Sequence, residues 1–131
     1  MALQYTTTHR TNAMNDLVTA AGATSYLLLY TGTAANVAAA ASGTLVASLP
    51  CSATFGTVSS GVLTANAITN ATAAASGTAI QWRLCTSSAG TTCVAQGTVG
   101  TSGADLNLNS NVISSGQTVS VSSFVITAFG A

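Results

Sequence analysis

The chain has 131 residues, only 3% of them charged, and its formal net charge at pH 7 is zero. This length suits one domain with a modest core. Without a basic surface the chain lacks the electrostatic footprint of a nucleic-acid-binding protein, so we expect no nucleic-acid partner. Apolar residues make up 48% of the chain. Because a net charge near zero favours association, we expect other subunits to cover much of the surface.

The N-terminal part contains the one predicted helix, over residues 11–22. Its apolar residues recur at the spacing of a single helix face, at Met14, Leu17, Val18 and Ala21. Thr11 or Asn12 suits the N-cap, and Gly22 suits the C-terminal end. We therefore expect residues 1–24 to form an arm with a short helix and residues 25–131 to form a β domain.

The same N-terminal part lacks the basic start and the apolar run of a signal peptide. The longest apolar runs of the chain are also too short to cross a bilayer. We expect synthesis and assembly in a cytoplasm, with no membrane partner.

From Ser25 onward the pattern indicates short strands, with apolar residues in runs or at every second position. We expect strands at 26–30, 45–50, 62–68, 80–85, 94–99, 106–109 and 119–128. Pro50 must end its strand or lie at a sheet edge. At Ser122 and Ser123 the apolar residues of the last strand change from odd to even positions, which predicts a β-bulge. Gly, Ser and Asn clusters between strands favour an all-β fold, an antiparallel β-sandwich or jelly roll, with a barrel as the alternative.

Residues able to carry out catalysis are scarce. His9 is the only histidine, and we expect it to be solvated near the N-terminus. Asp16 and Asp105 are the only carboxylates, and nothing in the sequence brings them together; Asp105 more readily accepts hydrogen bonds from turn amides. No Gly-x-Ser-x-Gly or Cys-x-x-Cys spacing occurs. We predict no catalytic residue, no cofactor, no metal site and no enzymatic activity.

Cys85 and Cys93 flank a Ser- and Gly-rich stretch that is typical of a hairpin loop. Folding that loop would bring the two residues within reach of a disulfide. Cytoplasmic synthesis favours free thiols, whereas release into an oxidising medium would close the bond, and both outcomes stay open. Cys51 is left over, and we expect it to be a small buried apolar residue rather than a bridge between subunits.

Trp82 and Arg83 are adjacent and point in opposite directions in the expected strand. Because Ile80 and Leu84 share its parity, we expect Trp82 in the core and not in a sugar or nucleic-acid site. Arg83 then faces the other way. We expect it either to pair with Asp105 or to cross an interface, where arginine is the most suitable cation.

A set of distinct short segments is spread along nearly the whole chain. They are Leu27-Leu28-Leu29-Tyr30 with Gly32-Thr33, GTLVA at 43–47 leading to ATF at 53–55, GVLTANAI at 61–68, Trp82-Arg83-Leu84, and GTVGTSGADLNLN at 97–109. Arg10-Thr11-Asn12 with Asp16-Leu17 adds a helical opening. This pattern resembles a family of small virion structural proteins of tailed bacteriophages. The block at 97–109 is its most specific part, and the cysteine pair and the scarcity of charge depart from it.

The resemblance implies a virion component with no catalytic residues to transfer. We expect a capsid decoration or cement-type protein that stabilises the particle through contacts with copies of itself and with the major capsid or a neck or tail protein. Candidate contact residues are Tyr5, His9 and Arg10 in the segment 2–12, together with Arg83 and the uncharged edge strands. The alternative is a neck- or tail-associated, or receptor- or glycan-binding, module, which would need an exposed aromatic platform.

Overall fold

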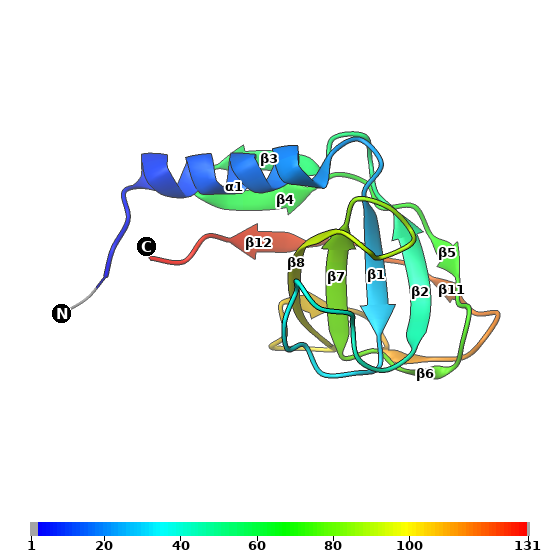
Figure 1. Ribbon diagram of the computed structural model, residues 1–131. Coiled ribbons are helices and arrows are strands. Elements are labelled where there is room, and N and C mark those ends of the chain that lie inside the picture. The colour runs from blue at the N-terminus through cyan, green and yellow to red at the C-terminus, as the bar shows by residue number, and fades with distance from the viewer. Residues whose placement is uncertain (1–2, 131) are drawn as a thin grey trace.

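The computed structural model describes residues 3–130 (Figure 1). Its one helix within that range is α1, Thr7–Ala21. The strands follow in chain order as β1 Tyr26–Tyr30, β2 Leu45–Pro50, β3 Gly56–Ser59, β4 Val62–Ala65, β5 Ala71–Thr72, β6 Gly77–Thr78, β7 Gln81–Cys85, β8 Cys93–Gly100, β9 Leu106–Asn107, β10 Val112–Ile113, β11 Thr118–Val119 and β12 Val125–Thr127. The expected class, mostly strands with one short helix, is confirmed.

The strands form one large sheet and several small ones. The large sheet has the order β2-β1-β7-β8-β9, and a second sheet has the order β12-β4-β3. The pairs β10-β6 and β11-β5 are separate two-stranded ribbons. All pairings are antiparallel except that of β8 with β9, which is parallel and departs from the expected antiparallel arrangement.

The central strands β1 and β7 are buried on both faces. All five residues of β7 are buried, as are the middle three of β1. One face belongs to the main core, where Leu27 lies opposite Leu84 and Leu29 lies opposite Trp82. Trp82 is only 3% exposed, as expected for a core residue.

The second face of the same strands is covered by two loops. Leu28 and Arg83 lie opposite each other on that face, and both are buried. Residues 31–44, here called the alanine loop, connect β1 to β2. Residues 86–92, here called the hairpin loop, connect β7 to β8. In Figure 1 both loops pass in front of β1 and β7.

The helix begins four residues earlier than expected, at Thr7 instead of residue 11. The prediction rested on apolar spacing, whereas the start is set by Thr6, whose hydroxyl accepts a hydrogen bond from the His9 amide at 3.1 Å. Gly22, with φ of +76°, follows the last helical residue as expected. Residues 7–12 are therefore helical and not part of an extended arm.

The helix packs on the β3–β4 hairpin and is not separate from the β part of the chain (Figure 1). Met14, Leu17 and Val18 contact the core from its inner face. The Thr11 hydroxyl accepts a hydrogen bond from the Gly61 amide, in the turn between β3 and β4, at 2.9 Å. Residues 1, 2 and 131 of the expected divisions lie outside the described residues.

Two strand predictions were wrong in detail. Residues 119–128 do not form one bulged strand, because β11 pairs with β5 while β12 pairs with β4. The change of parity at Ser122 and Ser123 marks the passage of the chain between two sheets. Strand β3 was not expected, and the strand expected over 62–68 ends at Ala65.

The centre of the large sheet allows a test of the core. Leu29 is fully buried against Trp82 and its neighbours, so Leu29→Ala removes apolar contacts and leaves a cavity. We expect the free energy of unfolding to fall by about 2–5 kcal/mol, measured by urea denaturation. Val112→Ala, at a side chain that is 64% exposed, is the control and should change it by no more than about 0.5 kcal/mol. Equal effects of the two substitutions would contradict this account of the core.

Candidate functional site

The first candidate site is an exposed apolar surface made by the two ends of the described chain. Leu3 is 65% exposed, Tyr5 is 37% exposed and Phe129 is 79% exposed. The rings of Tyr5 and Phe129 meet edge-on with centroids 6.0 Å apart, and the His9 ring lies 4.9 Å from Tyr5. We call Tyr5, His9 and Phe129, whose rings are in contact, the terminal patch.

Backbone and side-chain hydrogen bonds hold the terminal patch in place. The Tyr5 amide donates to the Gly130 carbonyl at 2.6 Å, which ties the segment before α1 to the segment after β12. Arg10 donates from Nε to the Tyr5 carbonyl at 3.3 Å and from its guanidinium to the Thr7 hydroxyl at 3.1 Å. The structure therefore brings Tyr5, His9 and Arg10 together around a hollow of about 150 Å³.

Phe129 belongs to this patch but was not singled out in the sequence. Its signal was present, because Phe124, Ile126 and Ala128 share one parity and Phe129 has the other. Phe124 and Ala128 are indeed buried while Phe129 projects outward. The side chain's position beside Tyr5 could not be predicted, because it depends on the contact between the two ends of the chain.

The second candidate site lies between the alanine loop and the hairpin loop. Arg83 is 2% exposed and donates to the Asn36 carbonyl at 2.8 Å and to the Ala39 carbonyl at 2.6 Å. The expected pair with Asp105 is not formed. Asp105 instead accepts hydrogen bonds from the backbone amide and the hydroxyl of Thr98, at 2.9 and 3.3 Å.

A pocket of about 460 Å³ opens between the two loops, here called the loop pocket. Its lining consists of Tyr30, Arg83, residues 37–41 and residues 89–91. Burial raises the pKa of the Tyr30 hydroxyl above its ordinary value, and the positive charge of Arg83 acts in the opposite direction. Arg83 is thus nearly enclosed, and its side chain lines this pocket.

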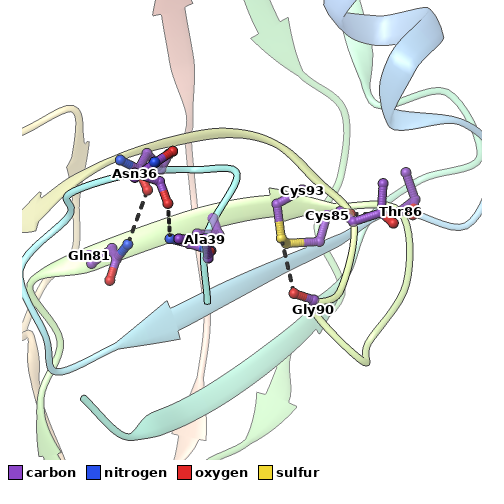
Figure 2. The surroundings of a disulfide bond; sticks show 10 residues. Asn36, Ala39, Gln81, Cys85, Thr86, Gly90 and Cys93 are labelled. Atoms are coloured by element: carbon purple, nitrogen blue, oxygen red, sulfur yellow. Dashed lines mark hydrogen bonds between the residues drawn. A yellow bond between two sulfur atoms is a disulfide. The ribbon is translucent and has the colours of Figure 1, made fainter. Parts of the chain in front are cut away.

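The hairpin loop is closed by a disulfide between Cys85 and Cys93 (Figure 2). The two cysteines face each other across the β7–β8 pair, and the Thr86 amide donates to the Thr92 carbonyl at 2.9 Å. The backbone carbonyl of Gly90 lies 3.5 Å from the Cys93 sulfur. The disulfide thereby fixes the wall of the loop pocket that residues 89–91 provide.

The two carboxylates and the histidine of residues 3–130 have separate surroundings. No three side chains of His, Cys, Asp or Glu in that range gather closely enough to hold a metal ion. Asp16 is exposed on α1, His9 is exposed beside Tyr5, and Asp105 is engaged with Thr98. None of the helical structure described is both long and apolar enough to cross a bilayer.

The disulfide allows a first test of this region. Replacing both Cys85 and Cys93 with serine should lower the free energy of unfolding by about 2–3 kcal/mol, because the open loop gains entropy in the unfolded chain. Urea denaturation with and without reductant measures it. Reductant should lower the stability of the wild type and of Cys51→Ser, but not that of the double variant. An unfolding midpoint of the wild type that ignores reductant would contradict the bond.

Cys51 allows a test by pH. Partial burial raises the pKa of its thiol, against smaller opposing contacts with Ser25 and Leu27. The folded chain therefore favours the neutral thiol, and this stabilisation is present below the ordinary thiol pKa of about 8.5 and is lost as the pH rises above it. We expect the wild type to lose more stability than Cys51→Ala between about pH 8.5 and pH 10, in urea denaturation at each pH. Parallel pH profiles would refute this.

Similarity to known proteins does not assign a function to these two sites. Comparison of the chain with protein-family models, with curated proteins and with solved structures finds no match. The features that bear on function are therefore the terminal patch, the loop pocket and the composition of the chain.

Proposed function

We propose that this chain is a bacteriophage virion structural protein, a decoration or cement-type subunit without enzymatic activity. It would stabilise the particle through contacts with copies of itself and with the major capsid or a neck or tail protein. The proposal also includes its location in the virion after assembly in the host cytoplasm. Its support is the resemblance of the segments between Leu27 and Asn109, the scarcity of charge, and the terminal patch.

The observation that carries the proposal is the terminal patch. Large apolar side chains concentrated on one surface are a feature of protein–protein contacts more than of isolated monomers. Here Phe129 is among the most exposed apolar residues described, and its ring meets the ring of Tyr5, whose backbone is held by hydrogen bonds. Aromatic side chains held in this way lose little entropy on binding and are typical anchors of an interface.

The scarcity of charge supports the same proposal. Of the four charged side chains, Arg83 is buried and Arg10 is half-buried over the β3–β4 turn, which leaves Asp16 and Asp105 exposed. A surface with so few ions can be covered at little cost in desolvation, because uncharged hydroxyl and amide groups need only exchange water for other hydrogen-bond partners. A stable contact needs on the order of 800 Å² per partner.

We also propose that the architecture belongs to the β-sandwich or jelly-roll class. Its support is the antiparallel pairing of β2, β1, β7 and β8, together with a second antiparallel sheet of β12, β4 and β3. A receptor- or glycan-binding role has less support, because Trp82, the largest ring, is enclosed in the core, and the exposed rings of Tyr5 and Phe129 meet edge-on and do not form a flat platform.

Association of the purified chain tests the proposal. We expect the wild type to form larger species with rising concentration in sedimentation velocity, and Phe129→Ser to weaken this association about ten-fold or more. Val112→Ser is the matched control, because Val112 is also strongly exposed but lies on β10, paired with β6 at the end of the molecule far from α1 (Figure 1). It should leave association unchanged.

A second measurement ties the association to a particle. Phage particles from a host that carries the gene should contain the chain in many copies, as measured by quantitative mass spectrometry. Virion assembly would be refuted by a chain that stays monomeric at every concentration and is missing from those particles. Equal effects of Phe129→Ser and Val112→Ser would remove the terminal patch from the contact.

A further inference from the structure

We propose that the loop pocket is a binding site for a carboxylate group, held by the guanidinium of Arg83 and the hydroxyl of Tyr30. The site stands on the geometry around Arg83. Only the assignment of the carboxylate to a neighbouring subunit rests on the proposed function.

The positive charge of Arg83 is the first reason to expect an anion in the loop pocket. The Arg83 side chain is 2% exposed, and a buried guanidinium stays ionised, so its positive charge needs compensation. The carbonyls of Asn36 and Ala39 supply hydrogen bonds but no negative charge. Both carboxylate side chains of the sequence lie elsewhere, Asp16 exposed on α1 and Asp105 bound to Thr98. Neither carboxylate side chain of the sequence therefore pairs with Arg83, and we assign that role to an anion from outside the chain.

The second argument is the set of hydrogen-bond donors. A guanidinium has five N–H groups, and two of them donate to the carbonyls of the alanine loop. The Gln81 amide is satisfied when its oxygen accepts from Arg83 Nε at 3.2 Å and its nitrogen donates to Gly32 at 3.2 Å. Two N–H groups of the fork stay available, one on each terminal nitrogen. A carboxylate accepts strong, charge-assisted hydrogen bonds from such donors.

The third argument is the lining of the loop pocket. Its volume of about 460 Å³ falls in the range of small-molecule sites. Four of the lining residues are the consecutive alanines 38–41, and Tyr30 adds a hydroxyl that can also donate to an anion. A single positive charge with methyl-lined walls suits a monoanion that carries a small apolar group. A phosphate dianion would require a second cation.

The hairpin loop keeps this pocket open. Gly90, with φ of +69°, packs above Leu28 and the Tyr30 hydroxyl, where any added side chain would come within about 3.0 Å of both. The disulfide closes the base of the same loop (Figure 2). Its Cys85 lies two residues after Arg83 in β7. One wall is therefore fixed by a covalent bond, and the other by the hydrogen bonds of Arg83.

The chain allows a direct measurement, because it has only two arginines and Arg10 serves as an internal control. We would titrate the ¹⁵N-labelled wild type with sodium acetate against sodium chloride at equal ionic strength, and follow the Nε–Hε signals by NMR. Acetate should shift the Arg83 signal along a saturating curve and leave Arg10 nearly unchanged. Small, linear shifts of equal size at both arginines would overturn the proposal.

Variants check that the Arg83 pocket is responsible. Tyr30→Phe should weaken acetate binding roughly five-fold through the loss of one hydrogen bond. Arg83→Lys keeps the charge but not the fork, and should abolish saturation in the amide signals of residues 37–41. Arg10→Gln should bind acetate as the wild type does. Equal acetate binding by Tyr30→Phe, Arg83→Lys and wild type would also overturn the proposal.

Assembled chains then distinguish the two sources of the carboxylate. If a second copy supplies it through Asp16, assembly should block acetate binding in the wild type, and Asp16→Asn should restore it. If the ligand is a free acid, assembled and monomeric chains should bind acetate alike. A chain that never associates would remove the proposed function, while a saturating Arg83 signal would still support the site.

Discussion

The pairing of β1 with β7 is the interaction on which the rest of the structure depends. It joins segments about fifty residues apart and places Leu27 and Leu29 opposite Leu84 and Trp82. Because both strands are in the middle of the large sheet, each needs cover on two faces. The small sheets and α1 pack around the core face, and the two loops cover the other. Loss of this pairing would leave both sets of neighbours without a surface to pack on.

The hairpin loop and the alanine loop are held over β1 and β7 by different interactions. The hairpin loop is closed at its base by the disulfide, so its position follows from the register of β7 and β8. The alanine loop is closed by hydrogen bonds between Thr31 and Thr44, and its middle is held by the guanidinium of Arg83. Arginine side chains normally face solvent. Arg83 is buried instead and holds the alanine loop through its hydrogen bonds, and it supplies the positive charge of the loop pocket.

The terminal patch and the loop pocket suit different kinds of contact. The patch offers exposed rings beside Tyr5 and favours burial of apolar area, which is non-directional. The loop pocket offers the charge of Arg83 and the hydroxyl of Tyr30, whose hydrogen bonds are directional and suit the proposed carboxylate. Under the proposed function, the terminal patch would supply most of the affinity and the loop pocket would set the register of a partner.

The sequence by itself determined the all-β class, the strands at Tyr26–Tyr30 and Leu45–Pro50, the burial of Trp82 and the scarcity of catalytic groups, because these follow from local periodicity and composition. The start of α1 at Thr7 depended on a cap that apolar spacing does not reveal. Only the tertiary structure decided that Arg83 is buried and that Phe129 meets Tyr5, since both depend on contacts between segments far apart in the chain.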